Sequence, residues 1–331
     1  MKKALVIGGG GFVGSAVARQ LLARGVEVAV AGRNRYRALA GQGIRILQGD
    51  IRDREFLVQA CRGFDTVFHT AAKAGIWGEK QEYEAINVTG TENVLHGCRV
   101  NDINVLVYTS TPSVVFDGRG IRGGDESLPH ARRFLCHYAA TKAKAENLVV
   151  AANTPGLRTC ALRPHLIWGP GDPHLVPRLV DRGRRGLLKR VGEGTNLVDI
   201  SYVDNVADAH VLAAANLHTT ASAAGRAYFI SQGEPVKLWE WVDDLFARLD
   251  IPPVTGRVTF RAAKAAGLLL EGVHSLFARG REPRMTRFLA EQLARSHWFS
   301  IEAARRDLGY EPRVTTEQGM ERLVAWLKRG K

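Results

Sequence analysis

With 331 residues, of which 45% are hydrophobic, the chain can bury a full core and is too apolar to be disordered. Its formal net charge is +13, but the basic residues are spread along the sequence without a nucleic-acid motif, which argues against a nucleic-acid-binding protein. The sequence shows no signal peptide, membrane-spanning run or paired-cysteine motif. We therefore expect a cytoplasmic protein with reduced thiols and no metal site.

The first predicted elements are a short apolar strand over residues 4–7, a glycine-rich loop and a helix over residues 15–24. Glycines let such a loop approach a pyrophosphate, and the free N–H groups at the helix start favour its negative charge. Both GxxGxxG and GxGxxG can be aligned with the loop. We expect it to bind a dinucleotide through Gly8, Gly11, Phe12, Val13 and Gly14.

The second predicted strand, residues 26–31, bears on the choice of cofactor. An enzyme that uses NAD often has an acidic residue at the end of this strand, where it binds the ribose hydroxyls. Here the strand is followed by Gly32 and Arg33. Because a guanidinium suits a 2′-phosphate, the sequence favours NADP(H), with NAD(H) as the alternative.

Further strands alternate with helices at residues 44–50, 66–72 and 105–110. This alternation predicts an α/β protein with a Rossmann-type, doubly wound parallel sheet and a smaller C-terminal substrate domain. We place the NAD(P)-binding domain at residues 1–165, with residues 200–217 returning to it. Residues 166–199 and 218–331 would then form the substrate-binding domain.

Tyr138 and Lys142 form a YxxxK pair on one face of a predicted helix that continues to residue 152. Hydride transfer at a carbon that bears oxygen requires a proton to move at that oxygen, for which a tyrosine of pKa ~10 is poorly matched. We expect Lys142 to lower the pKa of Tyr138 and to hold the nicotinamide ribose. Thr111, just after the strand at 105–110, would hydrogen-bond the substrate oxygen.

Together these motifs resemble the extended short-chain dehydrogenase/reductase family over almost the whole chain. The resemblance also rests on Gly49-Asp50, Ala71-Ala72, residues 87–91, Leu162-Arg163-Pro164, residues 168–172, residues 202–206 and residues 304–312. The family usually has serine at the hydroxyl position. Because Ser110 lies beside Thr111, it stays open which of the two contacts the substrate.

The resemblance implies roles for residues that spacing alone does not single out. Asp50 would contact the adenine, and Asn87 would support either the proton relay or the geometry of the active-site helix. Pro164 and His165 would flank the nicotinamide. The remaining residues that it places in the cofactor site are Ile51, Ala71, Ala72 and Lys73. Members of this family commonly form homodimers, partly through the helix that bears the tyrosine.

Residues 72–78, 109–114 and 287–293 are similar to the 3β-hydroxysteroid dehydrogenase branch, and more narrowly to bacterial 2-alkyl-3-oxoalkanoate reductases of olefin biosynthesis. Sterol 4-carboxylate 3-dehydrogenases are a close alternative. Either resemblance implies interconversion of a ketone and a secondary alcohol on a large hydrophobic substrate that bears a carboxylate. A sugar-nucleotide epimerase or dehydratase and a non-catalytic dinucleotide sensor remain alternatives of other classes.

Two segments are left without a defined role. Residues 265–277 are rich in Ala, Leu, Val and Phe, so they form either an amphipathic lid, a helix that contacts a membrane from one side, or an ordinary packed helix. The basic run at residues 178–190 is either a solvated helix face or a surface that attracts anions.

Overall fold

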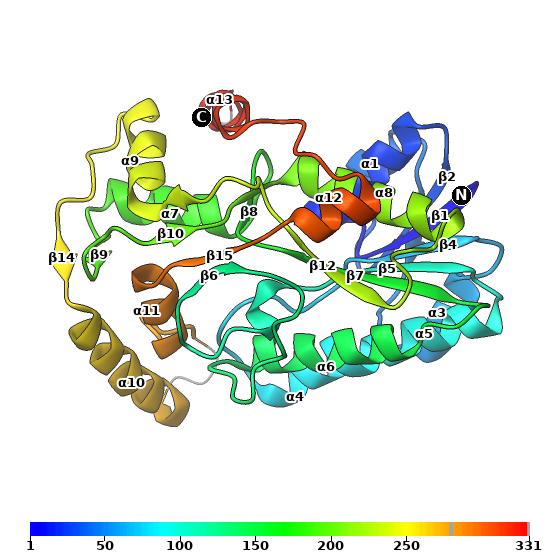
Figure 1. Ribbon diagram of the computed structural model, residues 1–331, viewed down its shortest axis with the longest axis horizontal. Helices are drawn as coiled ribbons and strands as arrows, with labels where there is room; N and C mark the ends of the chain where they lie inside the picture. The colour runs from blue at the N-terminus through cyan, green and yellow to red at the C-terminus, as the bar shows by residue number, and fades with distance from the viewer. Residues whose placement is uncertain (278–280, 330–331) are drawn as a thin grey trace.

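The computed structural model describes residues 1–277 and 281–329, and its centre is a seven-stranded parallel sheet (Figure 1). The strand order, β12-β7-β5-β4-β1-β2-β3, reverses between β1 and β4. This is the predicted Rossmann-type arrangement. Its strands are β1 (Lys3–Ile7), β2 (Glu27–Gly32), β3 (Arg45–Gln48), β4 (Thr66–His69), β5 (Val105–Thr109), β7 (Arg158–Pro164) and β12 (Arg226–Ile230).

The central strands are apolar because helices cover both faces of the sheet. Along β1, Ala4 and Val6 pack into one core, whereas Leu5 and Ile7 pack into the other. The first core lies under α1 (Phe12–Ala23), α8 (Val203–His218) and α12 (Glu302–Leu308). The second lies under α3 (Arg54–Ala60), α5 (Gly90–Val100) and α6 (His137–Ala151), on the opposite side of the sheet (Figure 1).

The sheet also includes a strand from the part of the chain that the sequence assigned to the substrate domain. Residues 226–230 form β12, which pairs in parallel with β7 at the edge of the sheet. As expected, the segment at 200–217 returns to this unit, because α8 packs against α1 and β5. The exact domain limits stay a prediction.

The second unit lies at the other end of the molecule and contains a smaller four-stranded sheet of order β13-β10-β15-β6 (Figure 1). Its strands are β13 (Val236–Lys237), β10 (Leu197–Val198), β15 (His297–Phe299) and β6 (Ile121–Gly124). Two strand pairs flank it, β8 (Ile167–Trp168) with β11 (Ser201–Tyr202) and β9 (Arg190–Val191) with β14 (Arg257–Val258).

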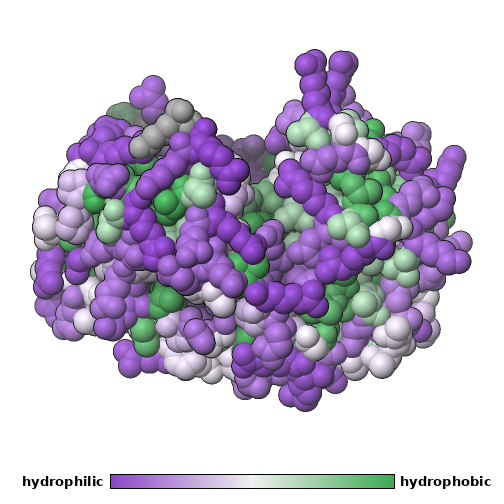
Figure 2. Space-filling view, turned by 90° about the horizontal axis from the view of Figure 1, so that it is seen from above, coloured by the Kyte–Doolittle hydropathy of each residue, from purple (hydrophilic) through white to green (hydrophobic). Residues whose placement is uncertain are grey.

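The helices that complete this second unit are α7 (Leu175–Arg184), α9 (Leu238–Arg248), α10 (Phe260–Phe277), α11 (Arg287–Ala294) and α13 (Thr316–Arg329). Helices α7, α9 and α13 pack around a core that includes Trp168, Trp239 and Trp241, whereas Ala263 of α10 and Ala290 of α11 belong to a smaller separate core. Short elements connect the larger ones: α2 (Arg37–Ala40), α4 (Lys80–Tyr83), the π-helix η1 (Glu84–Thr89) and the 3-10 helix η2 (Pro112–Val114). Seen from above, the surface is mostly hydrophilic and is hollowed between the two ends of the molecule (Figure 2).

Asn205 on α8 joins the main sheet to the C-terminal part of the chain. Its buried carboxamide donates hydrogen bonds to Gln232 Oε1 and to the Val314 carbonyl, both at 2.8 Å, and accepts one from the Val314 N–H at 3.0 Å. All three groups are buried, so water cannot replace a lost partner.

We expect Asn205→Ala to lower the free energy of unfolding by about 3 kcal/mol, because it leaves buried backbone and side-chain groups without partners. Urea unfolding measures the change. Asn104→Ala is the matched control, since the Asn104 side chain is exposed, and it should stay within about 0.5 kcal/mol of wild type. Equal effects of the two substitutions would contradict the role given to Asn205.

Candidate active site

The glycine-rich loop lies where the strand order reverses, between the ends of β1 and β4. Gly8 has a φ of +83°, and a Cβ there would lie 2.5 Å from the Ala71 backbone nitrogen. A Cβ on Gly14 would lie 2.4 Å from the Gly8 carbonyl oxygen. These positions therefore have no room for a side chain, which keeps the backbone of the loop close to the sheet and open to a ligand.

Helix α1 begins at Phe12, three residues earlier than the sequence pattern predicts, with Gly11 as its N-cap. Phe12, Val13 and Gly14 are consequently its first-turn residues, whose N–H groups have no acceptor within the helix. Aligned peptide dipoles add positive potential at this end. The predicted loop residues thus present a set of N–H donors suited to a pyrophosphate.

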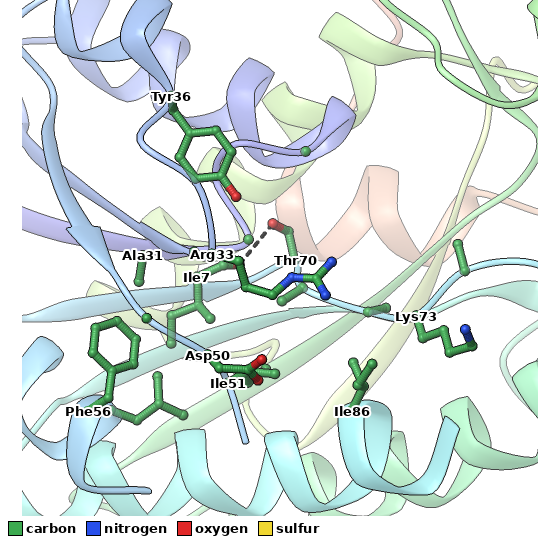
Figure 3. A pocket seen from close by; sticks show the side chains of 18 of the residues that line it. Ile7, Ala31, Arg33, Tyr36, Asp50, Ile51, Phe56, Thr70, Lys73 and Ile86 are labelled. Carbon is green, nitrogen blue, oxygen red and sulfur yellow. Dashed lines mark hydrogen bonds between the residues drawn. The ribbon is translucent and has the colours of Figure 1, made fainter. Parts of the chain in front are cut away.

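A cavity of about 390 Å³ extends from this loop across the ends of β2, β3 and β4 (Figure 3). Phe56 lies toward one end of it and Lys73 toward the other, with Asp50 between them. The structure brings together eight of the predicted cofactor residues in its wall: Gly8, Gly11, Arg33, Asp50, Ile51, Ala71, Ala72 and Lys73.

Tyr36 and His174 are among the cavity residues that the sequence did not predict. Tyr36 has a left-handed backbone with a φ of +37°, and its ring fills the space beside Gly10, where a Cβ would lie 1.9 Å from the ring. His174 reaches the cavity from the loop before α7. A glycine at position 10 is consistent with a close neighbour at that point, but the sequence does not indicate that Tyr36 is that neighbour.

Asp50, which the resemblance implies contacts the adenine, is held by Arg52. The Arg52 guanidinium donates two hydrogen bonds to the Asp50 carboxylate, at 2.9 and 2.7 Å, and the Arg52 backbone N–H donates a third at 2.9 Å. The side-chain hydrogen bond lowers the pKa of Asp50, so this carboxylate is an anionic acceptor at the cavity wall.

Asn87 connects the cofactor cavity to helix α6. It lies on the π-helix η1, and its carboxamide accepts from the Lys73 N–H at 2.7 Å and donates to Thr141 Oγ1 at 3.0 Å. Thr141 Oγ1 in turn donates to the His137 carbonyl at 2.9 Å. These contacts link the Lys73 loop to the first turns of α6, in keeping with the role in helix geometry that the resemblance implies.

Tyr138 lies in the first turn of α6 and keeps part of its side chain exposed. Desolvation raises the pKa of Tyr138 to about 12, although a hydrogen bond with Thr111 lowers it. The structure places the Thr111 hydroxyl beside this phenol, whereas Ser110 lies beside Glu146. Of the two hydroxyls left open by the sequence, Thr111 is therefore the one positioned next to Tyr138.

The expectation that Lys142 lowers the pKa of Tyr138 is wrong for this structure. The Lys142 ammonium is buried and donates to the Thr109 carbonyl at 2.5 Å, and it lies 4.1 Å from the centre of the Tyr108 ring. Burial lowers the pKa of Lys142 to about 7, partly opposed by the charge of Glu146. Its ammonium thus contacts β5, and Lys142 is not among the groups that shift the pKa of Tyr138.

Comparison with known proteins places this geometry in a family. Residues 5–258 match the 3-beta hydroxysteroid dehydrogenase/isomerase family. The chain belongs to that family. It is therefore an NAD(P)-dependent dehydrogenase or reductase, which confirms the family and the enzyme class predicted from the sequence.

Several relatives align over nearly the full chain. A 2-alkyl-3-oxoalkanoate reductase of Stenotrophomonas maltophilia (strain K279a) is 48% identical and covers 98% of this chain and 98% of its own length. A human (Homo sapiens) sterol-4-alpha-carboxylate 3-dehydrogenase, decarboxylating, is 35% identical over 98% of this chain and 87% of its own length. The structure of MoeE5 in complex with UDP-glucose and NAD is similar with a TM-score of 0.76 and 26% identity, over 99% of both chains.

The residues at the cavity fit the family's dinucleotide. The loop has no space for side chains at Gly8 and Gly14, which is the close approach that a pyrophosphate needs. First-turn N–H groups of α1 and the Arg33 side chain supply donors and positive charge along the same wall. The residues of the observed cavity therefore fit an NAD(P) molecule.

His165, predicted beside the nicotinamide with Pro164, belongs to a buried histidine pair. His297 Nε2 donates to the Gln292 carbonyl at 2.8 Å, so its Nδ1 accepts from His165 Nε2 at 2.6 Å. Burial lowers the pKa of His297 to about 4 and that of His165 well below its ordinary value, so both rings are neutral. The pair joins the end of β7 to β15, and contact with the nicotinamide stays a prediction.

A buried charge cluster lies close to Lys142. Glu146, one turn further along α6, accepts hydrogen bonds from the Arg163 guanidinium at 2.6 and 3.0 Å and from His130 at 2.6 Å. Burial alone would raise the pKa of Glu146, but the hydrogen bonds from Arg163 and His130 lower it to about 2. Its negative charge thereby favours the protonated form of Lys142.

We expect Gly14→Ala to weaken dinucleotide binding by about 10- to 100-fold, because the added methyl would force the loop away from the sheet. Titration calorimetry with NADPH measures this. Gly156→Ala is the control, since no atom lies within 4 Å of a Cβ at that position. Unchanged affinity in Gly14→Ala would contradict the assignment of the loop.

We expect Glu146→Gln to lower the free energy of unfolding by about 3–5 kcal/mol, because it leaves the buried Arg163 guanidinium unpaired. On the same helix, Lys144→Gln breaks an exposed ion pair with Glu84 and should cost at most about 1 kcal/mol. Urea unfolding at neutral pH compares the two variants.

The pH dependence gives a second readout of Glu146. Its pKa falls from 4.5 to about 2 on folding, so it contributes stability above pH 4.5 that is lost as the pH falls toward 2. Glu146→Gln should therefore lose less stability than wild type in this range. If the free energy of unfolding fell equally in both proteins over this pH range, the assignment would be contradicted.

Proposed function

We propose that the protein is a 2-alkyl-3-oxoalkanoate reductase that uses NADPH. The observation that carries the proposal is the 48% identity to the Stenotrophomonas maltophilia reductase over 98% of both chains. The present chain has Tyr138, Lys142 and Thr111, and the last of these lies beside the phenol.

The proposed substrate shares one chemical feature with that of the human relative. A 3-oxoalkanoate and a sterol-4-carboxylate oxidised at C3 both have the reacting carbon next to the carbon that bears the carboxylate. This common feature supports a β-oxo or β-hydroxy acid as the substrate class. The higher identity to the bacterial reductase favours the alkyl acid over the sterol.

In the proposed reaction, a bound NADPH supplies the hydride that reduces the C3 carbonyl carbon. Tyr138 donates its phenolic proton to the carbonyl oxygen, and the C–O double bond becomes the C–O single bond of the alcohol. A raised phenol pKa of about 12 keeps Tyr138 protonated at neutral pH, which is the form that an acid needs in the reductive direction.

Thr111 and Lys142 are proposed to support this proton transfer. The Thr111 hydroxyl donates a hydrogen bond to the same substrate oxygen and stabilises negative charge that develops there. Lys142 is proposed to hold the nicotinamide ribose with its ammonium, since the Thr109 carbonyl occupies only one of its three N–H donors. In the reverse direction Tyr138 accepts the proton from the alcohol.

The NADPH preference rests on the cavity wall after β2. Arg33 lines the cavity, and the residues that end β2 and follow it include no carboxylate that would repel a 2′-phosphate. The sugar-nucleotide alternative is supported by the likeness to MoeE5, at lower identity.

Replacing the proposed acid tests the function directly. Tyr138→Phe should lower the rate of NADPH oxidation with a long-chain 2-alkyl-3-oxoalkanoate by about 10²- to 10⁴-fold, with an unchanged dissociation constant for NADPH. Absorbance of the reduced cofactor measures the rate. The control is Tyr228→Phe, since Tyr228 lies on β12 and bonds Asp307. A near wild-type rate in Tyr138→Phe would overturn the mechanism, and turnover of a UDP-sugar but not of the acid would favour the alternative.

Removing the Arg33 guanidinium tests the choice of cofactor. Arg33→Ala should raise the KM for NADPH by about 10- to 100-fold, because one charge-assisted contact to a phosphate is lost, and should leave the KM for NADH nearly unchanged. Arg35→Ala, two residues further along the same exposed loop, is the control. A similar change for both cofactors would show that Arg33 does not read the 2′-phosphate.

A further inference from the structure

A loop of the second unit, residues 169–174, passes close to the glycine-rich loop. A cavity of about 450 Å³ has residues 10–12 of the glycine-rich loop in its wall, together with residues 170, 171 and 173. The next residue, His174, lines the neighbouring cavity of about 390 Å³, in which the dinucleotide fits. Because Gly11 lines both cavities, the loop at 169–174 lies beside the N-terminus of α1, where the pyrophosphate is expected.

His174 brings the second unit into contact with the dinucleotide cavity. In the described part of the chain, the other residues of the cavity wall all lie between positions 7 and 86. The His174 side chain is exposed, and within residues 1–277 and 281–329 its imidazole forms no hydrogen bond or ion pair. A neutral imidazole has one N–H donor and a protonated one has two. Either form therefore has a donor for an acceptor inside the cavity.

The backbone of His174 is held in place by Asp172. This carboxylate is buried and accepts hydrogen bonds from three consecutive backbone N–H groups, those of residues 174, 175 and 176, at 2.8, 3.2 and 2.8 Å. Val176 in turn packs in the core that includes Trp168. The imidazole thus starts from a fixed backbone, so little conformational entropy is lost when it binds a ligand.

The opposite end of the loop is fixed against the main sheet. Gly169 has a φ of +143°, and a Cβ there would lie 2.9 Å from the Val203 side chain at the start of α8. Helix α8 packs against α1, whose first turn presents its N–H groups to the cavity. The loop at 169–174 and the glycine-rich loop are therefore positioned by the same pair of helices.

The other cations of the cavity wall are already accounted for. Lys73 forms an ion pair with Glu82 at 2.8 Å, and Arg33 follows β2, where the 2′-phosphate is proposed to bind. The first-turn N–H groups of α1 approach the expected pyrophosphate from the main sheet. His174 supplies a donor to the same cavity from the second unit.

We propose that His174 donates a hydrogen bond to the pyrophosphate of the bound dinucleotide, so that the loop at 169–174 closes the cofactor site from the second unit. The pyrophosphate is then held by backbone N–H groups of α1 together with a side chain from the loop before α7. Dinucleotide binding thereby links the two units. This inference rests on the NAD(P) chemistry of the family and does not depend on the proposed substrate.

Titration calorimetry of the full chain tests the contact with two ligands, NADPH and ADP-ribose. ADP-ribose keeps the pyrophosphate and lacks the nicotinamide. His174→Ala should bind both ligands at least about fivefold more weakly, because a hydrogen bond to a charged group is lost. His174→Gln keeps a side-chain N–H donor and should bind both within about threefold of wild type. Arg178→Ala is the matched control, since it removes an exposed cation one turn further along the chain that pairs with Glu282.

The two ligands distinguish the position of the contact. Unchanged affinity of His174→Ala for both would overturn the proposal. A loss for NADPH without a loss for ADP-ribose would also overturn it, because the contact would then lie at the nicotinamide. Equal losses in His174→Ala and Arg178→Ala would reduce the effect to general charge and would overturn it too. Because no oxo acid is present, the result is independent of the proposed reductase activity.

Discussion

The burial of the Lys142 ammonium is the interaction on which the rest of the site depends. A lysine that is 2% exposed must have acceptors and nearby negative charge, and the structure supplies the Thr109 carbonyl, the Tyr108 ring and the anionic Glu146. Since Lys142 and Glu146 are both on α6, holding them in place also holds the first turn of the helix at the end of β5. Tyr138 is positioned by this constraint.

The cofactor cavity and this helix form one site because short polar contacts join them. Asn87 bonds both the Lys73 loop and Thr141, so a shift of α6 would disturb the cavity wall. The site therefore combines a cavity built on strand ends with Tyr138, the proposed proton donor, on α6. The second unit contributes His297 to the buried histidine pair at the end of β7.

The sequence alone predicted the features that depend mainly on residues close together in the chain. Buried apolar strands, glycines at crowded positions and a four-residue spacing on α6 predicted the sheet, the phosphate loop and the Tyr138–Lys142 pair. The sequence did not reveal long-range contacts. Tyr36 and His174 enter the cavity from loops without a periodic signal, and Arg163, a partner of Glu146 on α6, lies on β7. The predicted direction of the Tyr138 pKa shift was wrong, because the shift comes mainly from burial, and residue spacing does not reveal how a side chain is packed.

The central claim is that this member of the family transfers hydride from NADPH to the C3 carbon of a 2-alkyl-3-oxoalkanoate. The most direct measurement uses NADPH with deuterium at the transferable C4 position and determines the mass of the product. The account predicts a hydroxy acid that carries the deuterium at C3, together with an equal amount of oxidised cofactor. A product without deuterium, or a reaction that leaves the cofactor unchanged, would contradict it.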